Sequence, residues 1–115
     1  MVLVTLGTGI GAGLVSGGQL QRGANGFAGE PGHMVIDPDG PPCPCGRSGC
    51  WERYASGGGL GRMGRDAAVA GAGGLAVEFA GGDPESVRGE HVMRAAAEGD
   101  PVSYTHLTLP TTPYV

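Results

Sequence analysis

The sequence is poor in charge and has no long apolar run. Asp, Glu, Lys and Arg make up 16% of its 115 residues, hydrophobic residues make up 40%, and the formal net charge is −4. Disordered chains are usually charge-rich and poor in apolar residues, so this balance favours a folded domain. Without a basic surplus, duplex nucleic acid is not the expected partner. No apolar stretch approaches the ~20 residues of a membrane span, and no secretory signal opens the chain. We therefore expect a cytoplasmic protein with no membrane partner.

Glycine is the residue in excess, with 25 copies beside 9 prolines. Together they form roughly 30% of the chain, a share that is typical of low-complexity sequence when it has no pattern. Here the glycines are patterned, because Gly17-Gly18 separates two apolar runs and so predicts a β-hairpin turn. The sequence predicts strands over residues 2–6, 11–15 and 19–22.

The rest of the chain is expected to be loop and helix. We predict a short strand over 34–36, a loop over 37–50, and helices over 51–56, 60–69 and 90–98, with Gly99 just past the last helix. Residues 71–82 fit no single element.

Both ends of the chain are unusual. Met1 stands directly before an apolar run, so we expect the chain to begin inside a larger domain. Residues 101–115 contain no Asp, Glu, Lys or Arg but hold four of the six threonines. Such a change in composition indicates a linker or a segment of different origin. We therefore expect a partial domain over 1–100 and a non-native or unstructured tail over 101–115.

Glycine recurs at every second position from Gly7 to Gly13. No Gly-Lys-Ser/Thr follows, which excludes a Walker A loop, and a strand rather than a helix follows, which excludes a dinucleotide-binding fingerprint. Alternate glycines give a strand one face without Cβ atoms, so another body can approach its backbone. Amides from Gly7 to Gly9, with the Thr8 hydroxyl, suit an anion. The alternative is a hairpin that packs its glycines against another backbone.

Four potential metal ligands lie in the middle of the chain: His33, Cys43, Cys45 and Cys50. Zinc prefers four such ligands in a tetrahedron, and a closed site of this kind is structural because no position stays open for water. Gly46 and Gly49 allow the turns that bring Cys50 back to the other cysteines. Two alternatives remain open. The first is a disulfide between two of the cysteines, although such a bond is strained between close neighbours. The second is that His33 is only a polar residue at the start of a strand.

Two carboxylates flank these ligands, Glu30 three residues before His33 and Glu52 two residues after Cys50. Closure of a metal site would bring both near the imidazole. A metal-bound histidine still offers an N–H on its other nitrogen. Two acceptors and one donor suit a ligand rich in hydroxyl groups, such as a sugar. The alternative is that each glutamate is a solvated surface charge.

These residues resemble the signature of the ROK family (repressors, open reading frames, kinases). The matching positions are Glu30-Pro31-Gly32-His33, Gly40, Cys43-Pro44-Cys45-Gly46, Gly49-Cys50 and Glu52. Residues 6–13 resemble the second phosphate motif of the family, and residues 22–29 and 51–57 resemble its bacterial glucokinases. The resemblance covers about residues 1–100, and its specific part is the cysteine–histidine signature rather than the glycine run.

The resemblance implies an α/β, actin-like (ribonuclease H-like) ATPase fold, of which this chain would supply part of the C-terminal lobe with a zinc-binding loop. It implies ATP-dependent phosphorylation of a hexose, with glucose at its 6-hydroxyl as the expected substrate and Mg²⁺ accompanying ATP. Gly7, Thr8 and Gly9 would contact the phosphates. The sugar would be bound by Glu30, His33 and Glu52, with Asn25 close to it. A structural Zn²⁺ would be held by His33, Cys43, Cys45 and Cys50. The complete protein is expected to form a homodimer.

The catalytic base marks a departure from the family, in which it is the Asp of an Asn-Asp pair upstream of the first strand. This sequence contains no such pair, so we assign no catalytic residue and expect the 115-residue chain alone to lack kinase activity. A ROK-type sugar-responsive repressor is the alternative, and it would bring nucleic acid in as a partner. A third possibility is a stand-alone zinc module. The particular hexose, ATP or polyphosphate as donor, and the oligomeric state stay open.

Overall fold

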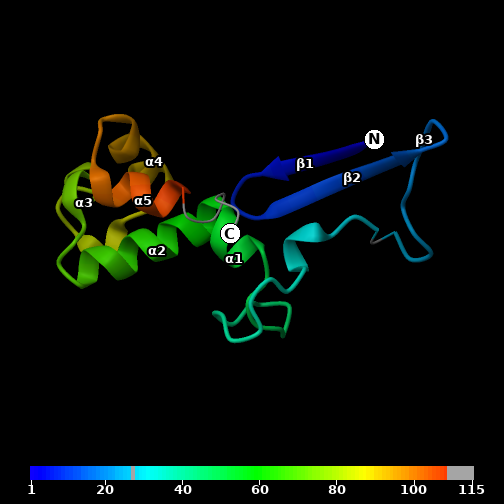
Figure 1. The fold of residues 1–115 in the computed structure, drawn as a ribbon, viewed down its shortest axis with the longest axis horizontal. Helices are drawn as coiled ribbons and strands as arrows, with labels where there is room; N and C mark the ends of the chain where they lie inside the picture. Colours follow the sequence, from blue (N-terminus) through cyan, green and yellow to red (C-terminus); the bar gives the residue numbers. More distant parts are fainter. Residues whose placement is uncertain (27, 109–115) are drawn as a thin grey trace. The chain divides into compact units, whose positions relative to one another are not determined.

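The computed structural model describes residues 1–26 and 28–108, and the chain divides into two compact units, Met1–Ser56 and Gly57–Val115 (Figure 1). The first unit contains the strands and the second contains the longer helices. None of the helices in the described part of the chain is long and apolar enough to cross a membrane.

The first unit begins with an antiparallel sheet of three strands in the order β1-β2-β3. The strands are β1 (Val2–Leu6), β2 (Ile10–Ser16) and β3 (Gln19–Leu20). The predicted turn is confirmed, because Gly17 and Gly18 have φ angles of +59° and +76°, which a two-residue hairpin turn of this type requires at both positions. The third strand is shorter than the predicted 19–22, and the chain turns again at Gly23, where φ is +74°.

The remainder of the first unit is mostly loop, with a short 3₁₀ helix η1 (Pro31–His33) and one turn of helix α1 (Glu52–Ala55). The predicted strand over 34–36 is wrong. Only the pair Val35↔Cys50 forms a β-bridge there. The pairing cannot extend because the partner segment turns at Gly49, where φ is +70°. The predicted loop over 37–50 is confirmed, and it carries a second single bridge, Pro42↔Ser48.

The second unit consists of α2 (Gly57–Val69), α3 (Gly74–Phe79), the 3₁₀ turn η2 (Pro84–Ser86), α4 (Gly89–Ala97) and α5 (Pro101–Thr108). Helix α2 starts before the predicted residue 60, although glycine is a poor helix former. Gly61 shows what glycine contributes, since a Cβ there would lie 2.9 Å from the amide nitrogen of Gly89. The predicted helix over 90–98 is confirmed, and Gly99 follows it with φ +89°. Helix α3 occupies the region that fitted no single element.

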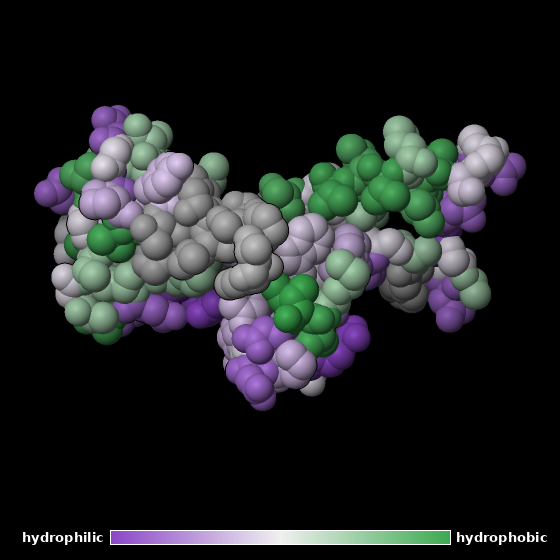
Figure 2. Space-filling model, in the orientation of Figure 1, coloured by the Kyte–Doolittle hydropathy of each residue, from purple (hydrophilic) through white to green (hydrophobic). Residues whose placement is uncertain are grey.

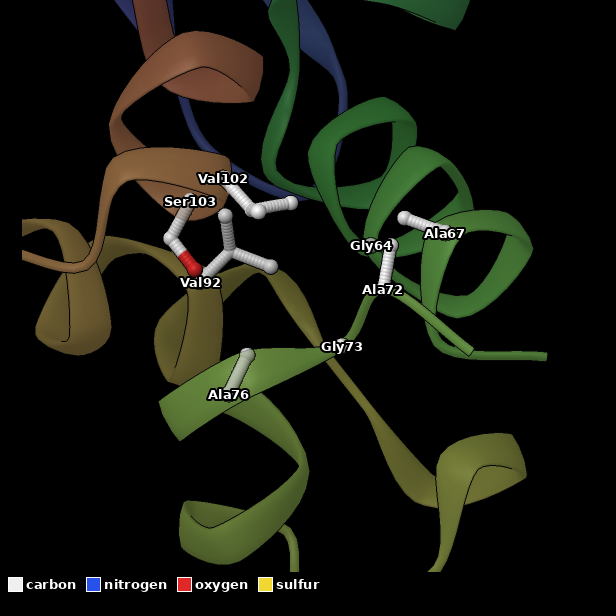
Figure 3. A pocket seen from close by; sticks show the side chains of 8 residues that line it. All are labelled: Gly64, Ala67, Ala72, Gly73, Ala76, Val92, Val102 and Ser103. Atoms are coloured by element: carbon white, nitrogen blue, oxygen red, sulfur yellow. The ribbon is translucent and has the colours of Figure 1, made fainter. Parts of the chain in front are cut away.

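The core of the second unit is a cluster of small and aliphatic side chains: Leu60, Ala68, Ala76, Val87, Val92 and Ala95. Figure 3 shows how α2, α3, α4 and α5 converge on it through residues such as Gly64, Ala76 and Val92. The residues around this small pocket are glycine, alanine, valine and one serine, none of which ionises. We therefore read it as core rather than as a ligand site.

Residues 101–108, the first part of the expected tail, form helix α5. Its start is set by Asp100, whose Oδ2 accepts a hydrogen bond from the amide of Ser103 at 2.9 Å. An acidic residue before a helix and a proline in its first turn are ordinary start signals. The rest of the expected tail, residues 109–115, lies outside the described residues.

Candidate metal centre and adjoining carboxylates

The loop of the first unit folds into a tight turn that carries two of the three cysteines. The amide of Cys43 donates to the carbonyl of Arg47 at 2.8 Å, and the amide of Gly46 donates to the carbonyl of Cys43 at 3.0 Å. Gly46 has φ +93°, a conformation that glycine adopts without the steric cost of a Cβ. This turn holds the sulfurs of Cys43 and Cys45 within 4.8 Å of each other.

The third cysteine is delivered by the β-bridge between Val35 and Cys50. The amide of Trp51 donates to the carbonyl of Met34 at 2.8 Å, next to His33 in the chain. Gly49 turns the chain into this bridge and lies so close to the carbonyl of Asp37 that a Cβ would overlap it. The predicted turning roles of Gly46 and Gly49 are therefore confirmed.

The four predicted ligands converge. Their ligand atoms all lie within 4.8 Å of one another. The Cys43 Sγ is 3.6 Å from His33 Nδ1, and the Cys45 and Cys50 sulfurs are 3.5 Å apart. A tetrahedral zinc site, with bonds of about 2.3 Å to sulfur and about 2.0 Å to nitrogen, puts its ligand atoms roughly 3.5–3.8 Å apart. The donor set thus suits zinc, and the separations of 3.6 Å and 3.5 Å match this spacing. All three cysteines are free thiols, so the disulfide alternative is not the arrangement found.

The electrostatics of the cluster also favour a bound cation. The pKa of Cys45 is lowered from 9.0 to about 6, mainly by a hydrogen bond from the Arg47 backbone. The pKa of Cys50 is raised to about 11, mainly by burial and also by the neighbouring sulfurs. The first thiolate to form is stabilised by its neighbours, and the last must form in a buried position beside negative charge. Burial and the neighbouring sulfurs thus oppose ionisation of Cys50, and a bound cation would offset that cost.

The segment before His33 lies against strand β2. A Cβ on Gly29 would be 2.8 Å from the carbonyl oxygen of Ala12, and one on Gly32 would be 2.6 Å from the carbonyl oxygen of Ile10. These close approaches fix the backbone on both sides of Glu30. Through these backbone contacts, the segment that ends at His33 packs against the sheet that contains the glycine hairpin.

The two predicted carboxylates have different environments. Glu30 precedes η1 and is exposed, and its carbonyl accepts a hydrogen bond from the His33 amide at 3.3 Å. Glu52 starts α1 and is half-buried, and its Oε2 accepts a hydrogen bond from the amide of Ile10 at 3.1 Å. The Glu52 carboxylate also lies beside Gly32, the residue before His33. The structure therefore places the Glu52 carboxylate beside the segment that carries Glu30 and His33.

Asn25 is not part of this group of contacts. It lies in an exposed turn after β3. Among the described residues, no hydrogen bond joins its side chain to Glu30, His33 or Glu52. Its predicted place near a ligand stays a prediction.

The glycine hairpin tip, Gly7 to Gly9, connects β1 and β2. The amide of Gly7 donates to the carbonyl of Gly9 at 2.9 Å, so this amide closes the tip instead of facing an anion. The amides of Thr8 and Gly9 have no acceptor among residues 1–26 and 28–108. Open space adjoins Gly7, since a Cβ there would meet nothing within 4 Å. Among the described residues, the tip thus leaves two amides without an acceptor beside the exposed Thr8 side chain, and its binding of an anion stays a prediction.

Two contacts were missed from the sequence. One is the hydrogen bond from Ile10 to Glu52, which joins residues 42 positions apart. The other is a hydrogen bond from the Tyr54 hydroxyl to Asp37 Oδ2 at 3.0 Å. It connects α1 to the loop of residues 37–50, which carries the three cysteines and is called the metal loop below. Neither follows a local pattern, so no periodicity or motif spacing indicates it.

Comparison with known proteins supports the family resemblance noted in the sequence. The model of the ROK family matches residues 1–109. The glucokinase of Streptomyces coelicolor is 44% identical over 105 residues, which are 90% of this chain and 33% of that protein. The chain thus spans about a third of the length of this curated relative.

Two solved structures extend the likeness to the fold. A ROK family glucokinase from Streptomyces griseus, in complex with glucose and AMPPNP, superposes with a TM-score of 0.79 and 40% identity over 93% of this chain and 36% of that one. A ROK family transcriptional regulator, a homologue of the Escherichia coli MLC protein, gives a TM-score of 0.71 and 33% identity over 96% of this chain and 27% of that one. These matches support the expected fold, of which the chain is a small α/β part. The chain belongs to the ROK family.

Proposed function

We propose that this chain forms the sugar-binding and phosphate-binding part of a ROK family hexose kinase that phosphorylates glucose at its 6-hydroxyl. The observation that carries the proposal is the cluster of His33, Cys43, Cys45 and Cys50, which Glu30 and Glu52 flank in the sequence. The likeness to the two Streptomyces glucokinases supports glucose as the substrate.

In this proposal, His33 binds a structural zinc ion through Nδ1, the nitrogen that faces the Cys43 sulfur. With Nδ1 engaged in this way, Nε2 of His33 would carry the proton and donate to a sugar hydroxyl. Glu30 and the Oε1 of Glu52 accept hydrogen bonds from other hydroxyls. These contacts hold the sugar with one hydroxyl toward the hairpin tip.

The amides of Thr8 and Gly9 bind the phosphates of ATP, with Mg²⁺ offsetting their charge. Phosphoryl transfer depends chiefly on alignment and charge stabilisation, which is the part these residues supply. The attacked hydroxyl also needs a general base within hydrogen-bond reach, and no residue of this sequence is assigned that role. We therefore propose that the 115-residue chain binds zinc and does not turn over ATP by itself.

The test uses the complete protein that carries these residues. We expect ADP production that needs both ATP and glucose, with kcat/KM at least about tenfold higher for glucose than for N-acetylmannosamine, a discrimination of ~1.4 kcal/mol. The variant His33→Gln removes a zinc ligand and a sugar contact together, whereas Glu30→Gln removes a sugar contact alone. The second variant is expected to raise KM at an unchanged zinc content. Phosphorylation of no hexose would contradict the proposal.

A repressor is the second candidate, and the likeness to the transcriptional regulator favours it. The two candidates share the sugar site but differ in chemistry. A repressor would bind glucose and release operator DNA, without producing ADP. Measuring ADP production and DNA binding on the same complete protein separates them.

A further inference from the structure

Glu52 joins three elements of the first unit. Its Oε2 accepts a hydrogen bond from the amide of Ile10 at 3.1 Å. Ile10 is the first residue of β2 after the hairpin tip, and it is buried. Glu52 itself follows Cys50 by two residues, so one carboxylate connects the metal loop to the glycine hairpin.

The seat of this carboxylate is made by two glycines. A Cβ on Gly9 would lie 2.8 Å from Oε2 of Glu52, and a Cβ on Gly32 would lie 3.0 Å from the same atom. Neither glycine has a positive φ, so backbone conformation does not demand glycine at either position. At Gly9 the atoms nearest to such a Cβ belong to the Glu52 carboxylate, whereas at Gly32 the carbonyl oxygen of Ile10, at 2.6 Å, is nearer still.

The two carboxylate oxygens have separate roles. Oε2 is held by the hairpin, and no donor among the described residues is paired with Oε1. A hydrogen bond to an ionised acceptor is stronger and more directional than a neutral one. Fixing Oε2 therefore also fixes the direction in which Oε1 is presented.

We propose that Glu52 is a positioning residue that fastens the phosphate hairpin to the metal loop through Oε2, while Gly9 and Gly32 keep its seat open. The order of the hairpin tip then depends on the closure of the metal loop. The sugar-facing oxygen and the phosphate-facing amides are set by one contact. This rests on the proposed function for the names of the ligands, but the contact itself does not depend on them.

The test measures hydrogen exchange of the Ile10 amide by NMR in the zinc-loaded chain, without sugar or ATP. In Glu52→Ala the exchange is expected to be about ten to a hundred times faster, as befits the loss of a bond to a charged acceptor, at one zinc per chain. Glu52→Gln keeps an acceptor oxygen and should restore most of the protection. Gly9→Ala places a methyl group whose nearest neighbours are all atoms of the Glu52 carboxylate, and it should speed exchange as Glu52→Ala does.

The matched control is Glu30→Ala, which removes the other carboxylate and should leave Ile10 exchange within about twofold. If Glu52→Ala loses zinc, Gly9→Ala decides, with faster Ile10 exchange at one zinc per chain expected and unchanged exchange overturning the proposal. Unchanged exchange in zinc-loaded Glu52→Ala overturns it as well. Failure of the complete protein to phosphorylate any hexose would leave these results untouched, so the two proposals fail separately.

Discussion

The two units of this chain bury different kinds of groups. Among the described residues of the first unit, Ile10 is the one buried aliphatic side chain, and the other buried side chains are those of Cys43, Cys50 and Ser56. Large side chains of its hairpin are exposed, Val2 and Leu6 at 63% each, and Figure 2 shows the apolar band over β1 and β2. The second unit buries a cluster of apolar side chains from its helices. Apolar burial stabilises the second unit, whereas ligand convergence and close backbone contacts order the first.

Removal of one metal ligand is the strongest way to break this comparison. We expect Cys50→Ser to abolish zinc binding, whose apparent free energy in small zinc-dependent folds is about 10–16 kcal/mol. Residues 31–55 should then lose hydrogen-exchange protection, whereas α2 and α4 should keep theirs. Exchange followed by mass spectrometry checks both regions. Ser48→Ala, a change in the same loop outside the cluster, is the control, and simultaneous loss of protection in both units would contradict the comparison.

A backbone substitution in the first unit is the next largest. Gly49 has φ +70° and no room for a Cβ beside the carbonyl of Asp37. Gly49→Ala is expected to cost about 2 kcal/mol or more, and so to weaken zinc affinity by roughly 30-fold. Competition with a chromophoric chelator measures this. Gly46→Ala is the matched change, since it has φ +93° but nothing within 4 Å of its Cβ, and it should weaken affinity less.

The corresponding experiment in the second unit shortens a buried apolar side chain of its core. Val92 is 1% exposed and belongs to the core cluster. Val92→Ala is expected to lower the free energy of unfolding of the helices by about 2 kcal/mol, from lost burial and the cavity left behind. Urea unfolding followed by far-ultraviolet circular dichroism measures it. Val69→Ala, at a position that is 61% exposed, should change it little, and zinc affinity should stay unchanged in both variants.

What the sequence could predict follows the same division between local and distant effects. The hairpin turn at Gly17-Gly18 and the convergence of His33 with the three cysteines were predicted correctly, because each depends on residues close together in the chain. The bond from Ile10 to Glu52 spans 42 positions, and no local pattern carries that information. The expected sugar contacts came from the family resemblance, and the structure adds how Glu52 is held.

The wrong predictions have physical reasons of the same kind. A strand over 34–36 needs a partner of equal length, and the turn at Gly49 removes it. Helix α2 begins on glycines whose low propensity is outweighed by packing, since Gly59 and Gly61 are buried. Asp100-Pro101 is a local start signal for α5, but the change in composition beyond it led to the expectation of a tail.

The smallest expected effect concerns Asp100 at the start of α5, and it makes the stability of the second unit depend on pH. The pKa of Asp100 lies below its usual 3.8, chiefly because Ser103 hydrogen-bonds to the carboxylate. A carboxyl group whose pKa is lower in the folded than in the unfolded state stabilises the folded state at pH values above its unfolded pKa. This contribution is lost as the pH falls through its folded pKa. Asp100→Ala should therefore lower the stability of the helices by about 1 kcal/mol at pH 7, with a smaller difference below pH 3.8.

Urea unfolding at pH 7 and pH 3 measures this, with Asp83→Ala, which removes the same kind of cap from the exposed turn η2, as the control. A difference that grows on acidification would contradict the assigned role of Asp100. Because the described part of the second unit contains no proposed zinc ligand, this acid response should be the same with and without zinc.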